Sequence, residues 1–175
     1  MIFKSIEHFR VKNYFLNNLS VWTALIIIIP HAHATTTIGS ASVSIIQSAE
    51  ITESQGMSFG KIALNNNQGD VITLAPDGST SSITANVISG SLVQNAIFSA
   101  SGAPNAPISL TFQNGFITGA GSSMNIQNFT HNAGETPTLS PAGSLTFKVG
   151  AELQINENQA TGNYNGTYQI TVNYQ

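Results

Sequence analysis

Apolar and polar residues alternate through most of the chain, most clearly near its C-terminal end. Residues 145–149 and 151–155 place an apolar side chain at every second position, and residues 166–174 do the same with tyrosine, isoleucine and valine. A period of two in β-branched and aromatic residues, bounded by Asn and Gly, is typical of half-buried antiparallel strands. We therefore expect the final segment to be a strand inside a sheet or along its edge, where it could accept a partner strand.

The same alternation continues toward the N-terminus in shorter segments. The further predicted strands are residues 41–51, 57–62, 71–75, 83–87, 96–100, 108–112, 116–118 and 124–129. Asn114-Gly115 is the strongest hairpin pattern in the chain, and residues 130–143, with two prolines and two glycines, form the longest predicted loop. Many short strands separated by turns predict an all-β fold, a single immunoglobulin-like antiparallel β-sandwich.

The first 34 residues differ in character from the rest. Three basic residues precede an apolar stretch at 19–29, and Ala32-His33-Ala34 follows it. This order predicts a secretory signal peptide, residues 1–34, cleaved after Ala34. The apolar stretch has about half the ~20 residues that a membrane-spanning helix needs, although a retained anchor is the alternative. The prediction leaves residues 35–175 as one domain without a transmembrane segment, exported through the inner membrane to the periplasm and then to the cell surface or the exterior.

Charge narrows the range of partners. Residues 35–175 contain two lysines, no arginine and seven carboxylates, for a net charge near −5. Nucleic acid and anionic lipid both require several cationic contacts, so neither is an expected partner. The chain has no cysteine, so its stability must come from the sheets and their core.

No complete set of catalytic or metal-binding residues is visible. His131 is the only histidine after residue 34, and we expect it to be a solvated loop residue. Glu50 and Glu53 should point to opposite faces of a strand. Asp70 and Asp77 bracket a strand and could hold calcium, but the dense ligand spacing of calcium loops is missing. We therefore expect no enzyme activity, no cofactor and no metal.

A resemblance rests on the C-terminal residues. The patterns Val149-Gly150-Ala151-x-Leu153 and Gly162-x-Tyr164-x-Gly166-x-Tyr168-x-Ile170-x-Val172-x-Tyr174 resemble the ending of a family of secreted Gram-negative domains of unknown function. Residues 57–62 and 76–78 match its early Phe-Gly element and its first turn. That family is similar to the pilins of chaperone–usher fimbriae and to spore coat U-type domains. Many such pilins place a glycine fourteenth from the C-terminus and a tyrosine next to last, as Gly162 and Tyr174 lie here.

The resemblance implies a periplasmic chaperone, an outer-membrane usher and like subunits as partners. We therefore expect a structural, non-enzymatic subunit of a surface fibre or extracellular coat, assembled by β-strand donation. Gly162 lies before the final strand, whose Tyr168, Ile170, Val172 and Tyr174 would line the acceptor groove. The donor candidates are Ile38, Ala41, Val43 and Ile45.

Alternatives remain for the role of residues 41–51 and for the function of the protein. Residues 41–51 could instead be the first strand of a complete sandwich. The second candidate function is then a self-contained secreted adhesive or ligand-binding domain, and a hydrolase with an unrecognised site is the third.

The cleavage prediction can be checked directly. Exported material should begin at Thr35, because the small residues at 32 and 34 meet the requirements of a signal peptidase. Intact-mass measurement tests this, and a mass that retains residues 1–29 would favour an anchored protein.

Overall fold

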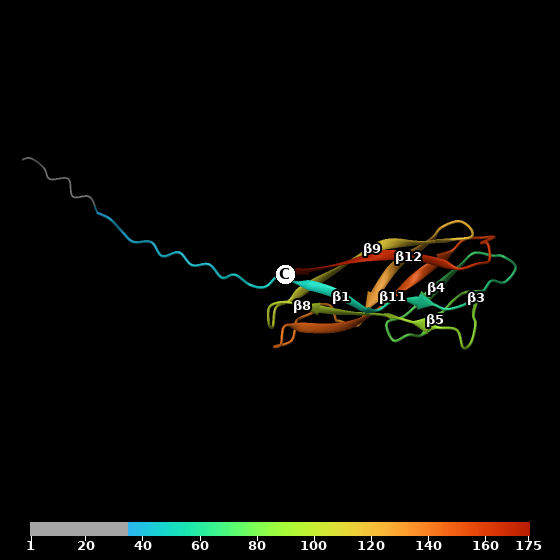
Figure 1. Ribbon diagram of the computed structural model, residues 1–175, viewed down its shortest axis with the longest axis horizontal. Coiled ribbons are helices and arrows are strands. Elements are labelled where there is room, and N and C mark those ends of the chain that lie inside the picture. The colour runs from blue at the N-terminus through green and yellow to red at the C-terminus, as the bar shows by residue number, and fades with distance from the viewer. Residues whose placement is uncertain (1–34) are drawn as a thin grey trace, which may run out of the picture. The chain divides into compact units, whose positions relative to one another are not determined.

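A computed structural model describes residues 35–175, in which every regular element is a β-strand (Figure 1). The strands are β1 (Glu50–Gln55), β2 (Ser58–Phe59), β3 (Ile62–Ala63), β4 (Asp70–Leu74), β5 (Thr80–Ser81), β6 (Asn86–Val87), β7 (Val93–Gln94), β8 (Ala96–Ser101), β9 (Ile108–Gly119), β10 (Met124–His131), β11 (Ser144–Ile155) and β12 (Tyr164–Tyr174). The chain divides after Ser42, and the second unit, Val43–Gln175, holds all twelve strands. The predicted all-β sandwich is confirmed. No helix in this part of the chain could span a membrane, and the predicted signal peptide lies outside the described residues.

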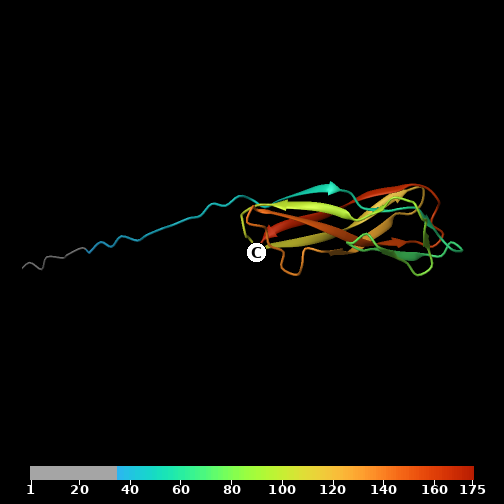
Figure 2. The same ribbon diagram turned by 90° about the horizontal axis from the view of Figure 1, so that it is seen from below.

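Strand β11 is the centre of the sandwich. The main sheet runs in the order β1-β8-β11-β10-β9-β12, and every neighbouring pair is antiparallel. Residues 144–149 of β11 pair with β8, whereas its later residues pair with β10 on one side and with β4 on the other. Because β11 exchanges partners along its length, the sheet folds over into two packed layers, seen from a second side in Figure 2.

The alternation of residues 145–155 explains why β11 takes this place. Phe147, Val149, Leu153 and Ile155 are buried on one face, while the intervening polar residues are more exposed. Gly150 lies where β11 passes from β8 to β4, and a Cβ there would overlap the carbonyl oxygen of Leu74. The glycine is thus required by the close approach of the β4 backbone.

The core has two clusters along the sandwich. The first joins β4, β10 and the end of β11, and contains Phe59, Ile72, Leu74, Ala85, Met124, Ile126, Ala151, Leu153 and Ile155. The second joins β8, the start of β9 and the start of β11, and contains Ala96, Phe98, Ala100, Ile108, Leu139, Phe147 and Val149. The inward residues of β12, from Tyr168 to Tyr174, pack against the second cluster but are only half-buried.

The hairpin predicted at Asn114-Gly115 is wrong. Strand β9 runs straight through these residues, and the turn comes after Gly119. Gln113 pairs with Gln169 and Phe116 with Thr167, so Asn114 and Gly115 together face the single residue Tyr168. This is a β-bulge, in which a glycine is needed because a Cβ on Gly115 would overlap the Thr167 carbonyl oxygen. The Asn-Gly pattern permits a tight turn, but here the absence of a side chain on Gly115 instead allows the backbone of β12 to approach the bulge.

The long first strand predicted for residues 41–51 is also wrong over most of its length. Strand β1 begins only at Glu50, and residues 41–48 are exposed and belong to no strand. Val43 is 86% exposed and Ile45 92% exposed, so neither belongs to the core of this chain. The apolar alternation of this segment therefore has no partner within the described residues.

A buried carboxylate anchors the loop between β5 and β6. Asp70 is only 4% exposed, and its carboxylate lies against the backbone of residues 83–85. Its Oδ1 accepts hydrogen bonds from the backbone N–H groups of Val71 (2.7 Å) and Ile83 (3.2 Å), and its Oδ2 from those of Thr84 (2.9 Å) and Ala85 (2.5 Å). Burial by itself raises the pKa of Asp70, but these donors outweigh it and hold the pKa below its usual value.

We predict that Asp70→Asn lowers the free energy of unfolding at neutral pH by about 1–3 kcal/mol, because an amide NH₂ cannot accept the bonds made to one oxygen. The folded-state pKa of Asp70 is depressed, so its contribution is present above the unfolded-state value near ~4 and is lost as pH falls through the folded-state value. Urea unfolding of wild type and variant between neutral and acidic pH measures both effects. Asp77→Asn, in an exposed turn, is the control and should change little. Equal unfolding midpoints for Asp70→Asn and wild type at neutral pH would contradict the assignment.

Candidate functional site

Two strand edges face each other without pairing. Within the described residues, β1 pairs only with β8, and β12 pairs only with β9. Figure 1 shows β1 between β8 and β12, at the end of the sandwich where the C-terminus lies. The path from β1 to β12 has five antiparallel steps, so the two edge strands are antiparallel to each other. Each of these edges carries backbone N–H and C=O groups that a further strand could satisfy.

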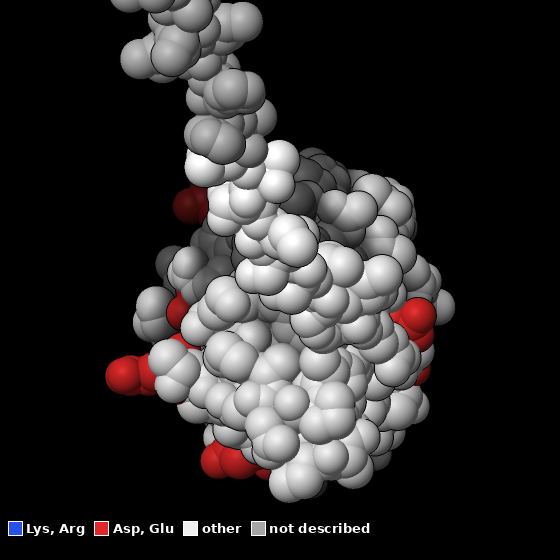
Figure 3. Space-filling model, turned by 90° about the vertical axis from the view of Figure 1, so that its left-hand side faces the viewer, with Lys and Arg blue, Asp and Glu red and all other residues white. Residues whose placement is uncertain are grey.

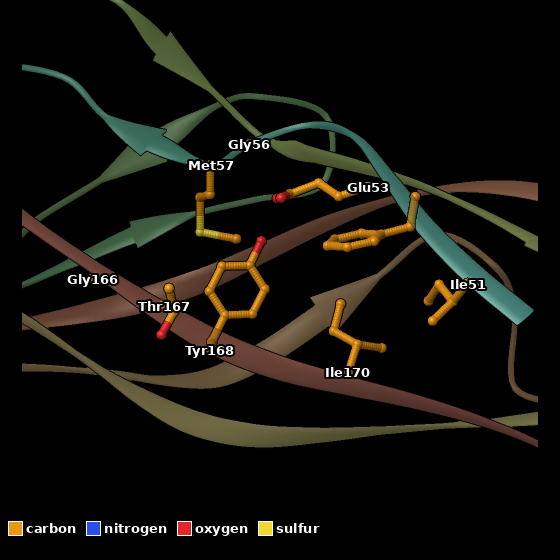
Figure 4. A pocket seen from close by; sticks show the side chains of 9 residues that line it. Ile51, Glu53, Gly56, Met57, Gly166, Thr167, Tyr168 and Ile170 are labelled. Atoms are coloured by element: carbon orange, nitrogen blue, oxygen red, sulfur yellow. The ribbon is translucent and has the colours of Figure 1, made fainter.

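An open groove lies between these edges (Figure 4). Its volume is about 270 Å³, and it is lined by Ile51, Glu53, Gly56, Met57, Phe98, Gly166, Thr167, Tyr168 and Ile170. Strand β1 and the residues just after it form one wall, β12 forms the other, and Phe98 of β8 contributes between them. The lining is mixed: four side chains are apolar, and those of Glu53, Thr167 and Tyr168 are polar.

The β9 bulge places Tyr168 at the groove. Asn114 and Gly115 oppose it, and a Cβ on Gly115 would lie 2.9 Å from the Cβ of Tyr168. The inward side chains of β12 alternate from Tyr168 to Tyr174, but all four are half-buried, whereas the inward residues of β11 from Phe147 to Ile155 are fully buried. The inward face of β12 is therefore packed from below and left partly uncovered on the side of β1.

Six aromatic side chains form a closed circuit beneath the groove. Successive ring centroids lie 5.1–6.4 Å apart in the order Phe98, Tyr168, Phe129, Phe112, His131, Phe147 and back to Phe98. The expectation that His131 is a solvated loop residue is therefore wrong: it ends strand β10 and stacks on Phe112. Aromatic contacts at these distances add to the stability of the layers that they join.

One polar group in the groove lacks a partner. The Tyr168 hydroxyl is buried and makes no hydrogen bond within the described residues. Burial raises the pKa of Tyr168, and the negative charge of Glu53 raises it further. Figure 4 shows the Glu53 carboxylate on the side toward which this hydroxyl points, although the pair does not reach hydrogen-bonding geometry. A strand in the groove could supply a polar partner to either group.

The structure separates the residues expected to form the acceptor site. Tyr168 and Ile170 line the groove, whereas Val172 and Tyr174 pack into the second core cluster farther along β12. Gly162 lies in the connection between β11 and β12, with φ +155° and with the Cβ of Ala120 only 2.9 Å from where its own Cβ would be. It does not line the groove.

The donor candidates are all exposed. Ile38 is 99% exposed and Ala41 is also exposed. Like Val43 and Ile45, they belong to no strand. The sequence reasoning missed the opposite wall, namely Ile51, Glu53, Met57 and Phe98. The alternation through Ile51 marked a strand, but nothing local indicated that this strand would face β12.

The carboxylates do not gather into a metal site. Both oxygens of Asp70 accept backbone hydrogen bonds, and Asp77 accepts from Ser79 within its own turn, so the calcium site considered for this pair is not formed. No group of three His, Cys, Asp or Glu side chains suited to a metal lies within residues 35–175. On the face shown in Figure 3, Asp and Glu lie toward the rim and no Lys or Arg is visible.

We predict opposite effects of the same substitution at two tyrosines of β12. Tyr168→Phe should raise the free energy of unfolding by about 1 kcal/mol, because it removes a buried hydroxyl without a partner. Tyr164→Phe should lower it by about 1 kcal/mol, because that hydroxyl donates to the Ala160 carbonyl (2.7 Å) and accepts from Gln159 Nε2 (2.8 Å). Urea unfolding monitored by circular dichroism measures both, and destabilisation by Tyr168→Phe would show that its hydroxyl is satisfied.

Comparison with known proteins shows which family the sandwich domain belongs to. No curated protein and no solved structure gives a significant match to this chain. A family model described as Domain of unknown function (DUF4402) matches residues 49–174, which run from the residue before β1 to the last residue of β12. The matched region covers well over half of the chain and both walls of the groove, and the chain therefore belongs to this family of domains of unknown function.

Proposed function

We propose that this protein is a structural, non-enzymatic subunit of a surface fibre or extracellular coat, assembled by β-strand donation. The observation that carries the proposal is the pair of unpaired edges, β1 and β12, which face each other across a groove lined by both apolar and polar side chains. A strand inserted there would bond to both edges and place alternate side chains in the groove. The resemblance of the C-terminal residues to pilins and to spore coat U-type domains supports the same mechanism.

The segment before β1 has the pattern of a donor strand. Ala41, Val43 and Ile45 lie on one face of an extended chain, and Ser40, Ser42 and Ser44 lie on the other. Ile38 falls on the serine face, so it is the weakest of the four donor candidates. Burying the exposed side chains of Val43 and Ile45 in a neighbouring groove would contribute about 1.5–3 kcal/mol each.

The polarity of the edges constrains the inserted strand. Because β1 and β12 are antiparallel, a single strand between them is antiparallel to one and parallel to the other. Strand β12 offers 11 residues and β1 offers six. Antiparallel pairing is slightly more stable per residue, so the donor should run antiparallel to the longer edge, β12.

The partners are those that the resemblance to chaperone–usher pilins implies. A periplasmic chaperone would fill it with a strand of its own after export, and an outer-membrane usher would exchange that strand for the segment of a like subunit. Each mature chain carries a net charge near −5, so like subunits repel weakly. With only two lysines and no arginine in residues 35–175, recognition would rest mainly on backbone and apolar groups.

We predict that substitutions on the two faces of the donor segment act differently. In exported protein, Val43→Asp with Ile45→Asp should abolish self-association, because the charged aspartates that replace these apolar side chains would be buried in the groove without a partner. Ser42→Asp with Ser44→Asp adds the same charge on the opposite face and should leave self-association intact. Size-exclusion chromatography with light scattering measures the oligomers. A cooperative wild-type monomer at micromolar concentration would reject strand donation and favour the self-contained binding domain.

Disulfide trapping locates the donor, and the chain has no native cysteine to interfere. A chain carrying Ile170→Cys should cross-link under oxidising conditions to chains carrying a cysteine at Ala41, Val43 or Ile45, according to the register. Ser42→Cys should not cross-link, because its side chain points out of the groove. Equal cross-linking from both faces would place the donor elsewhere.

A further inference from the structure

Tyr174 joins the end of β12 to two other segments. Its hydroxyl accepts a hydrogen bond from the backbone N–H of Ala103 (2.7 Å) and donates one to the carbonyl of Gln47 (2.6 Å). Gln47 lies just before β1, one wall of the groove, and Tyr174 ends the strand that forms the other wall. The hydroxyl therefore connects the end of β12 to the residues that link the donor segment to β1.

Gly102 makes this contact possible. A Cβ at Gly102 would overlap the Tyr174 hydroxyl oxygen and lie 3.1 Å from Cζ of the ring. The missing side chain leaves the space that the tyrosine head fills, next to the N–H of Ala103 that bonds to it. The position of the hydroxyl is thus fixed from two sides, by the 102–103 backbone and by Gln47.

A chain of this topology has a short route to filling its own groove. Residues 41–45 lie shortly before β1, so a three-residue turn at residues 46–48 would fold them back along the open edge of β1, with Val43 opposite Ile51 on the groove side. They would then run antiparallel to β1 and parallel to β12. Such a closure is intramolecular and needs only a short loop, so by entropy alone it competes well with donation between chains.

Two features oppose that closure. The carbonyl of Gln47, which lies within the required turn, is held by Tyr174. The turn would also have to form from Ile46, Gln47 and Ser48, which include no glycine, proline, asparagine or aspartate, and none of them has a positive φ. The segment is therefore kept extended at the point where it would have to reverse.

We propose that Tyr174 is a latch that keeps the donor segment out of the chain's own groove, so that strand donation takes place between chains. The inference rests on the proposed function and adds its regulation: the latch selects the polymer over a self-filled monomer. Tyr174 acts as a positioning residue here, because it directs the donor segment without lining the groove.

The test compares two tyrosines on one strand. Tyr174→Phe keeps the ring in the second core cluster and removes only the hydroxyl with its two hydrogen bonds. Tyr164→Phe, at the other end of β12, also removes a hydroxyl with two hydrogen bonds and is the matched control. In exported protein, Tyr174→Phe should raise the ratio of monomer to polymer about fivefold or more relative to Tyr164→Phe, as measured by size-exclusion chromatography with light scattering.

A second variant makes the closure favourable. Gln47→Asn with Ser48→Gly, added to Tyr174→Phe, places glycine at the third, left-handed position of a three-residue turn at 46–48, the loop length that keeps Val43 and Ile45 on the groove side. It should give a monomer whose melting temperature exceeds that of Tyr174→Phe by about 5 °C. Adding Val43→Asp with Ile45→Asp should remove this gain, whereas Ser42→Asp with Ser44→Asp should not.

The outcomes separate the latch from the proposed function. A wild type that never self-associates would reject strand donation, and the latch with it. A wild type that assembles, with a monomer fraction that is the same in Tyr174→Phe and Tyr164→Phe, would reject the latch alone. A turn variant that still polymerises, with no gain in melting temperature, would also reject it, since the donor segment would then not enter the groove that begins beside it.

Discussion

The feature on which the rest of this structure depends is the separation of β1 from β12. The two strands are antiparallel, so their polarity would allow direct pairing, yet they face each other across a groove of about 270 Å³. Six aromatic rings form a closed circuit beside the groove, and two of them, Phe98 and Tyr168, line it. Closely packed rings of this kind resist rearrangement.

The two halves of the sandwich are therefore unequal. In the first core cluster, side chains of β4, β10 and β11 are fully buried, and the Asp70 carboxylate fixes the adjoining loop through backbone hydrogen bonds. In the second, β12 is only half-covered. The fully buried half can hold the fold while the inward face of β12 stays partly uncovered. This matters in a chain without disulfides, where packing and hydrogen bonds alone must maintain the sheets.

Two glycines and two tyrosines determine how β12 packs against its neighbours. Glycines 102 and 115 contribute by lacking a side chain: one admits the Tyr174 hydroxyl, and the other admits the β12 backbone opposite the bulge. Tyr168 and Tyr174 lie on the same face of β12, six residues apart, but their environments differ. The first has a buried hydroxyl without a partner among residues 35–175, and the second bonds to two backbone groups. The groove wall and the contact to Gln47 thus belong to a single strand.

The sequence by itself determined which residues alternate. The periods through residues 145–155 and 166–174 correctly predicted β11, β12 and the all-β class, because a strand's in–out pattern is local. Pairing is not local, so the same reasoning failed elsewhere. Residues 41–49 have the pattern of a strand and no neighbour to pair with, Asn114-Gly115 forms a bulge opposite Tyr168, and His131 stacks among aromatic rings. Only the tertiary structure decided that β1 and β12 face each other unpaired and that Tyr174 reaches Gln47, because these contacts join residues more than a hundred positions apart in the chain.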